Sequence, residues 1–192
     1  MELLGEIRSL SIATVDEAGS PQVRIIDTLY YKGNLYFVTA RGKEFYHQLI
    51  ANSNIGIVGM TKDWRMIRIN ATIKPAPREY VDIIFDHFKG INDVYPGDKR
   101  RILDAFCVQS GYGELFDLGD TPIYRKSFAF GGACAKEKGF LITKDCISCG
   151  TCAQSCPQDC IEEGTPYKIH QHNCLHCGLC REVCPAGAVS IL

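Results

Sequence analysis

The distribution of apolar and polar residues along the first part of the chain predicts short strands separated by turns. Residues 7–15, 22–31 and 34–39 are rich in β-branched and aromatic side chains, and turn-forming residues lie between them at 16–21 and 32–34. Apolar residues at helical spacing predict a helix over 43–51, and strand character returns at 55–60 and 64–73. These elements describe an antiparallel meander interrupted by one helix.

The following stretch predicts two more helices, over 78–89 and 98–108, and then strands at 112–118 and 121–130. Many antiparallel strands with few helices, and no regular alternation of strand and helix, favour a small antiparallel barrel of the α+β class. Gly131 and Gly132 predict a linker. We therefore expect a barrel domain over residues 1–130 and a second domain over 134–192.

Composition and charge exclude several classes of partner. The 192 residues are 46% hydrophobic, enough for one sizeable core or two smaller units. A formal net charge of -1 provides no cationic field for a phosphate backbone, so we expect no nucleic-acid partner. No apolar run approaches the roughly 18 residues of a membrane span, and the first residues lack the basic region of a secretion signal. The sequence thus predicts a cytoplasmic protein with no membrane contact.

Cysteine dominates the C-terminal segment. Ten of the 11 cysteines lie in the last 59 residues, and the total is odd. Disulfides of a secreted domain would favour an even number, whereas dense cysteine in a reducing compartment indicates metal or redox chemistry.

These cysteines form an internal repeat of 28 residues, and each copy reads Cys-x2-Cys-x2-Cys-x3-Cys-Pro. The spacing is typical of runs that hold [4Fe-4S] clusters, in which the first three thiolates bind one cluster and the fourth binds the other. We predict one cluster on Cys146, Cys149, Cys152 and Cys184, and a second on Cys174, Cys177, Cys180 and Cys156. Two tetrahedral zinc sites are the alternative, but zinc requires neither the third cysteine nor the Cys-Pro ending.

The other cysteines and the nearby histidines carry no ligand spacing. Cys160 occupies the position of Ala188 in the second copy, so we expect it to be a small buried filler. Cys107 and Cys134 are expected to be structural. The three histidines near the second site are interpreted as solvated loop residues, although His176 has a position from which it would modulate a cluster potential.

Residues 134–192 resemble a bacterial-type two-[4Fe-4S] ferredoxin domain over nearly their whole length. Residues 1–130 resemble the FMN-binding split β-barrel family of pyridoxamine 5'-phosphate oxidase-like proteins. The stretches 22–27 and 34–43, and the helix that begins at 44, carry this second resemblance. The family implies a homodimer with flavin at the subunit interface, to which residues 65–70 of the second subunit would contribute.

The second resemblance implies a set of FMN ligands. A phosphate is well held by a fixed cation, a hydroxyl and the free amides at a helix start, and residues 39–43 offer these just before a helix. Apolar strand residues would contact the ring system, whereas Trp64 is interpreted as core or dimer packing. The alternative is that Arg24, Arg41 and Lys43 are ordinary solvated side chains. The expected cofactor-binding residues are Arg24, Ile25, Ile26, Val38, Thr39, Arg41, Gly42 and Lys43.

The combination predicts an FMN-dependent iron-sulfur oxidoreductase in electron transport, in an anaerobic or microaerobic setting. Single electrons would pass between the clusters and FMN, from a ferredoxin or similar partner protein to a small molecule or protein acceptor. An oxidase that consumes dioxygen fits poorly beside oxygen-sensitive clusters. Two alternatives remain open. One is a non-enzymatic electron carrier whose barrel docks a partner without flavin, and the other is an interaction module stabilised by zinc. The sequence identifies no catalytic residue, donor, acceptor, direction of flow or cluster potential.

Overall fold

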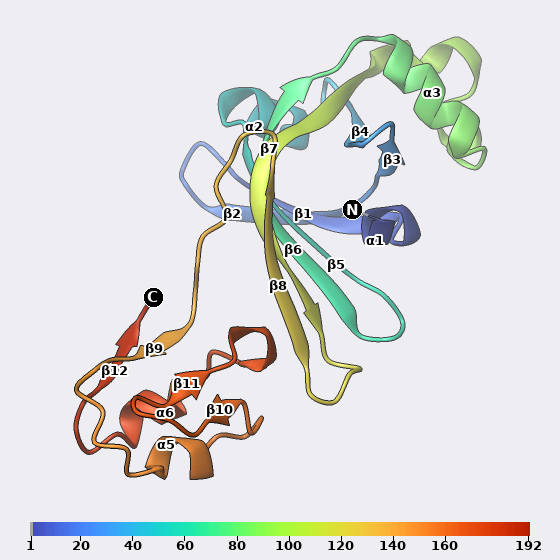
Figure 1. Cartoon of the computed structure of the whole chain (residues 1–192). Coiled ribbons are helices and arrows are strands. Elements are labelled where there is room, and N and C mark those ends of the chain that lie inside the picture. The colour runs from blue at the N-terminus through green and yellow to red at the C-terminus, as the bar shows by residue number, and fades with distance from the viewer. Residues whose placement is uncertain (1) are drawn as a thin grey trace. The chain divides into compact units, whose positions relative to one another are not determined.

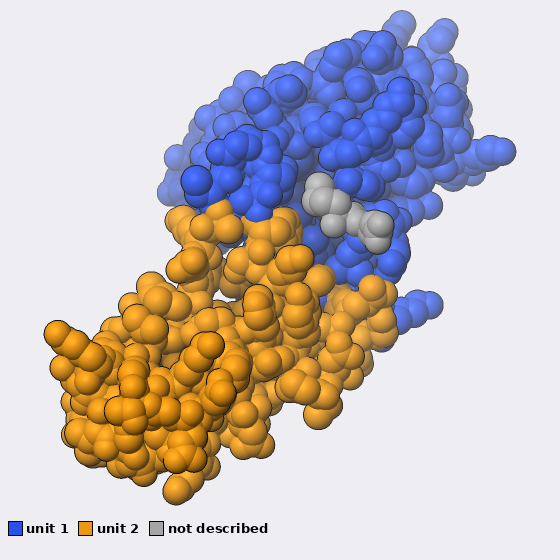
Figure 2. All heavy atoms as spheres, in the orientation of Figure 1, with its two compact units in different colours: residues 1–62, 66–113, 129–134 blue, residues 63–65, 114–128, 135–192 orange. Residues whose placement is uncertain are grey.

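The computed structural model describes residues 2–192 and divides into two compact units (Figure 2). Unit 1 comprises the described residues up to 62, together with 66–113 and 129–134. Unit 2 comprises 63–65, 114–128 and 135–192. The tip of a long hairpin thus belongs to the same unit as the cysteine-rich segment.

Unit 1 is built on an antiparallel sheet, which confirms the predicted α+β barrel class (Figure 1). The strand order is β2-β1-β5-β6-β7-β4-β3, and β8 pairs with β7. The strands are β1 (Ser9–Val15), β2 (Pro21–Asp27), β3 (Leu29–Tyr31), β4 (Asn34–Ala40), β5 (Asn54–Met60), β6 (Arg65–Pro75), β7 (Leu103–Asp117) and β8 (Tyr124–Phe130). The predicted strand over 22–31 is therefore two strands, which separate at Thr28.

Period-two alternation places one face of these strands in the core. Leu10 and Ile12 of β1 are fully buried, and the odd-numbered apolar positions of β6 from Ile67 to Ile73 are buried as predicted. On the opposite face of the neighbouring strand β2, Val23 is 71% and Ile25 is 72% exposed.

Helices cover other parts of the sheet. The helices of unit 1 are α1 (Glu2–Glu6), α2 (Glu44–Ala51), α3 (Glu79–His87) and α4 (Ile91–Val94). The predictions at 43–51 and 78–89 are confirmed, and Val81 and Phe85 of α3 pack against Ala40 and Leu103 of the sheet. Over the described residues, no helix is long and apolar enough to cross a membrane.

The helix predicted over 98–108 is wrong. A short 3-10 helix, Gly97–Ile102, leads directly into β7, which begins at Leu103. Residues 105–108 are all buried because β7 lies between β4 and β6 and is covered on both faces. A continuous apolar run of this kind is typical of a central strand, and it also satisfies helical spacing over one or two turns.

The cysteine-rich part of unit 2 repeats in structure as it does in sequence. Its first copy carries α5 (Thr151–Gln154) and its second copy carries α6 (Leu179–Glu182), 28 positions later. Two small sheets complete it, one pairing β9 (Phe140–Ile142) with β12 (Val189–Ile191), the other pairing β10 (Ile161–Glu162) with β11 (Lys168–Ile169). Its small core contains Ile142, Ile169 and Val189 together with buried cysteines.

Candidate functional site

The eight predicted cysteine ligands gather around two cavities in unit 2. Cys146, Cys149, Cys152 and Cys184 line one, and Cys156, Cys174, Cys177 and Cys180 line the other. Each cavity therefore takes three cysteines from one copy of the repeat and the fourth from the other copy. In each copy a short helix contains the third cysteine and separates it from the fourth, which lines the other cavity.

Equivalent residues of the two copies adopt the same unusual backbone conformation. Ser148 and His176 have φ of 54° and 58°, and Gly150 and Gly178 have φ of 76° and 85°. This left-handed conformation turns backbone amides inward, so that the Ser148 amide donates to Cys146 Sγ at 3.4 Å and the His176 amide to Cys174 Sγ at 3.3 Å. Such amides stabilise a sulfur ligand that carries negative charge.

The protonation of the thiols depends on their surroundings. Burial raises the pKa of Cys152, and it raises the pKa of Cys180 to about 11. The Thr151 hydroxyl lowers the pKa of the exposed Cys149. A thiol that binds a metal loses its proton to form a thiolate. Four thiols per cavity form the donor set of a [4Fe-4S] cluster.

A fifth cysteine lies in the second cavity. Cys160 is buried, and its Sγ lies 3.6 Å from Cys156 Sγ. Burial raises the pKa of Cys160, which favours the neutral thiol. Its counterpart in the other copy is Ala188, whose amide donates to Cys184 Sγ at 3.3 Å.

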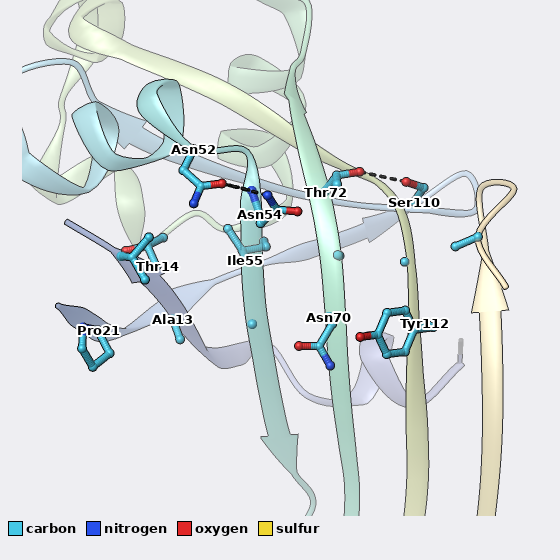
Figure 3. A pocket seen from close by; sticks show the side chains of 15 residues that line it. Ala13, Thr14, Pro21, Asn52, Asn54, Ile55, Asn70, Thr72, Ser110 and Tyr112 are labelled. Atoms are coloured by element: carbon cyan, nitrogen blue, oxygen red, sulfur yellow. Dashed lines mark hydrogen bonds between the residues drawn. The ribbon is translucent and has the colours of Figure 1, made fainter. Parts of the chain in front are cut away.

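Unit 1 contains a cavity of about 530 Å³ bordered by β1, β5, β6 and β7 (Figure 3). This volume lies within the roughly 300–1,000 Å³ of small-molecule sites. Its wall carries a hydrogen bond of 2.8 Å between the hydroxyls of Thr72 and Ser110. A Cβ on the neighbouring Gly111 would lie 2.5 Å from the Asn70 carbonyl oxygen, so only glycine allows β6 and β7 to approach this closely.

Arg24 lies beside this cavity and a second one. The second, of about 660 Å³, shares Val15 and Asn52 with the first. Arg24 donates to Thr14 Oγ1, which lines the first cavity, and to Gln48 Oε1, which lines the second, the latter at 2.9 Å.

The guanidinium of Arg24 is held firmly in this place. It also stacks over the Phe45 ring, 4.5 Å from its centroid, at the start of α2. Burial lowers the pKa of Arg24, and the Glu44 carboxylate partly offsets this effect. A fixed and partly desolvated cation of this kind fits an anionic group such as phosphate.

The other predicted phosphate ligands are dispersed. Lys43 is exposed at the start of α2, beside the exposed Gly42, and Thr39 is buried within β4. Arg41 instead turns to β7, where it forms an ion pair of 2.8 Å with Asp104. Arg24 and the start of α2 are therefore brought together, whereas the charge of Arg41 is already balanced.

The predicted ring contacts occupy different faces. Ile25 is exposed and Ile26 is half-buried on the opposite face of β2, so the two side chains do not contact one surface. Val38 packs against the α3 side of the sheet. None of the eight predicted FMN residues lines either of these two cavities.

Sequence reasoning missed two residues of this region, Thr14 and Gln48. Their side chains are buried and joined by a hydrogen bond of 2.6 Å from Thr14 Oγ1 to Gln48 Oε1. Gln48 is a polar residue on the buried face of α2, next to Leu49. A polar side chain at an otherwise apolar helical position is the signal that would have identified it.

An antiparallel barrel followed by a repeat with two four-thiol cavities defines a fusion of a split barrel with a two-cluster iron-sulfur domain. The family model for pyridoxamine 5'-phosphate oxidase matches residues 1–96, and the model for the 4Fe-4S dicluster domain matches residues 145–188. The chain belongs to the pyridoxamine 5'-phosphate oxidase family and carries a C-terminal 4Fe-4S dicluster domain.

Solved structures share the fold of the barrel. A NimC/NimA family protein from Clostridium acetobutylicum is 24% identical with a TM-score of 0.59, over 67% of this chain and 88% of that one. PhzG from Burkholderia lata, solved with tetrahydrophenazine-1-carboxylic acid, is 12% identical with a TM-score of 0.54, over 68% and 80% of the two chains.

The cysteine-rich segment resembles a curated ferredoxin. The ferredoxin of Butyribacterium methylotrophicum is 47% identical over 32 residues, which are 17% of this chain and 58% of that protein. The chain thus spans little more than half the length of this relative.

Proposed function

We propose that the protein is a redox protein in which two [4Fe-4S] clusters exchange single electrons with an FMN bound by the barrel. The observation that carries this proposal is the gathering of eight cysteines into two four-thiol cavities on the same chain as a barrel of the pyridoxamine 5'-phosphate oxidase family. Clusters carry one electron at a time, whereas a flavin exchanges one or two. Joining both converts single electrons into the pairs that most organic acceptors require.

The proposed FMN site combines the Arg24 region with the start of α2. Arg24 and Lys43 would supply cations for the phosphate, and the first amides of α2 lack partners within the helix. Thr39 and Gly42 lie in the same expected phosphate segment, whereas Arg41 is paired with Asp104, and the side chains of Ile25, Ile26 and Val38 do not share one surface. When bound, FMN supplies hydride or electron transfer, and the chain's own residues hold and orient it.

A homodimer is part of the proposal. β1 pairs with both β2 and β5, so Ile25 and Val58 flank Ser11 on one face of the sheet. Ile25 is 72% and Val58 is 38% exposed, and Val23 and Met60 extend the same exposed apolar face. An exposed apolar sheet face is typical of a subunit interface.

The electron donor is proposed to be a ferredoxin or similar protein, and the acceptor a small molecule or a protein. The alternative is a carrier whose barrel docks a partner without flavin. Anaerobic purification distinguishes them, because the redox enzyme contains about eight iron, about eight sulfide and about one FMN per chain, whereas the carrier contains no FMN. Zinc without sulfide would contradict both.

The FMN affinity of variants tests the proposed phosphate site directly. Loss of a hydrogen bond to a charged group costs about 1.5–3 kcal/mol, so Arg24→Gln or Lys43→Ala should weaken FMN binding by about 10–100-fold. Thr39→Val in combination with Lys43→Ala should weaken it further. Iron content should not change, and Lys32→Ala, at an exposed turn away from the site, serves as the control. Unchanged FMN affinity in all three variants would remove the assignment.

A further inference from the structure

The two cysteine loops have the same backbone but different charged surroundings. In the second loop, Arg125 donates to His176 Nδ1 at 2.6 Å and to the Leu175 carbonyl oxygen at 3.4 Å. Both acceptors lie between Cys174 and Cys177. The equivalent residues of the first loop are Ile147, which is 65% exposed, and Ser148, whose hydroxyl bonds to the neutral Gly164 carbonyl and Thr165 hydroxyl.

Arg125 is fixed in this position by the tip of the β7–β8 hairpin, which belongs to unit 2. Two further bonds attach β8 and the residues before it to the second copy of the repeat. His172 Nδ1 lies 3.1 Å from the Arg125 carbonyl oxygen, and Asn173 Nδ2 donates to the Ile123 carbonyl oxygen at 2.8 Å. The first copy has no equivalent of these bonds among the described residues.

The charge of Arg125 is buried, and its carboxylate partner is shared with a second cation. Its side chain is 10% exposed and lies over the Phe116 ring at 4.7 Å. Glu114 is 3.7 Å from Arg125 and also 3.5 Å from Lys138, so one carboxylate faces two cations. The cluster of Glu114, Arg125 and Lys138 therefore carries a net positive charge next to the second loop.

Reduction adds one negative charge to a cluster. A buried positive charge nearby stabilises the reduced state more than the oxidised state, because Coulomb interactions are weakly screened away from water. Net charge and hydrogen bonding around the ligands are among the features that set the potential of such clusters. The effect is larger on the second loop, since the contacts of Arg125 are with that loop.

We propose that Arg125 raises the reduction potential of the cluster on Cys174, Cys177, Cys180 and Cys156 above that of the cluster on Cys146, Cys149, Cys152 and Cys184. This rests on the proposed function, in that both clusters must be bound. The chain then has a built-in order of reduction, and the second cluster accepts the first electron. Arg125 is a positioning residue that acts through its field on the cluster.

The test is an EPR-monitored redox titration of the full chain, purified without oxygen, with iron and sulfide measured for every variant. Arg125→Gln should lower the midpoint potential of the cluster on Cys174, Cys177, Cys180 and Cys156 more than that of the other cluster, and Arg125→Lys should keep the wild-type value. Lys126→Gln is the matched control, because it removes an equal but exposed charge from the next residue of β8. Cys149→Ser and Cys177→Ser assign the two signals, since each alters the spectrum of one cluster.

A second variant distinguishes an effect of the Arg125 charge on the cluster potential from an effect of a loosened structure. Glu114→Gln removes the balancing carboxylate and should raise the potential of the same cluster, opposite in sign to Arg125→Gln. If Arg125→Gln fails to bind iron, the Glu114→Gln variant tests the proposal instead. A higher potential of the same cluster supports it, and a lower or unchanged potential contradicts it.

The inference is overturned if both clusters shift equally, if Lys126→Gln has the same effect, or if neither potential moves in a chain with about eight iron. A wild-type chain without iron or sulfide would instead overturn the proposed function.

Discussion

Residue by residue, the structure shows which thiols line which cavity. Cys184 lies 38 positions from Cys146 in sequence, yet both line the same cavity, whereas Cys160 lies four positions from Cys156 in the second cavity and is not a predicted ligand. The spacing of the motif predicted the ligands, and the fold places each fourth cysteine at the cavity of the other copy's loop. Arg24 illustrates the opposite case, since its partners Thr14 and Gln48 lack a sequence motif.

Exchange of the fourth ligand predicts the behaviour of cysteine variants. Cys184→Ala and Cys146→Ala should each remove or alter the same EPR signal, and Cys156→Ala should affect the other signal, because each cluster needs four thiolates. Cys160→Ala is the control, a buried thiol in the second cavity that is not a predicted ligand, and it should retain about eight iron per chain. Loss of different signals from the Cys184 and Cys146 variants would refute the exchange.

Among the elements, β7 shows how tertiary packing overrides a local pattern. Phe106 is 1% exposed and stacks with Phe37 at a centroid distance of 5.7 Å, whereas Ile102 precedes the strand and is 44% exposed. A helix over 98–108 would have placed both on one apolar face, since they are four residues apart. The pairing of β7 with β4 fixes their different environments.

The observed strand β7 and the helix predicted over 98–108 lead to different expectations for the stability of two alanine variants. Phe106→Ala should lower the free energy of unfolding by about 3–5 kcal/mol, because it leaves a cavity in the core. Ile102→Ala should change it by less than about 1 kcal/mol, because the side chain is largely in water. Urea unfolding followed by circular dichroism under anaerobic conditions measures both. Similar losses would indicate that the two residues share a buried face.

The whole molecule presents an exposed apolar sheet face that a second copy would cover. If it does, the mass in solution is about twice the 21.4 kDa of one chain. Ile25→Asp should shift the protein toward the monomer, since a carboxylate would be buried without a partner. Ile191→Asp, at an exposed apolar position of unit 2, is the control and should leave the mass unchanged. Light scattering measures the mass, and a wild-type monomer would contradict the dimer.

The sequence by itself determined the features that depend on short spacings along the chain. The cysteine repeat, the alternation of β6 and the start of α2 each follow from a few neighbouring residues, because a loop around a cluster, a half-buried strand and a helix all have short periods. The eight thiols and the class of the barrel were readable for that reason.

Only the tertiary structure decided which distant residues meet. Arg125 and His176 are 51 positions apart, and Arg24 and Gln48 are 24 apart. β7 became a central strand because neighbours on both sides covered it, although its own pattern also fits a helix. Contacts of this kind depend on how whole elements pack, and burial then determines which charges and thiols face each other away from water.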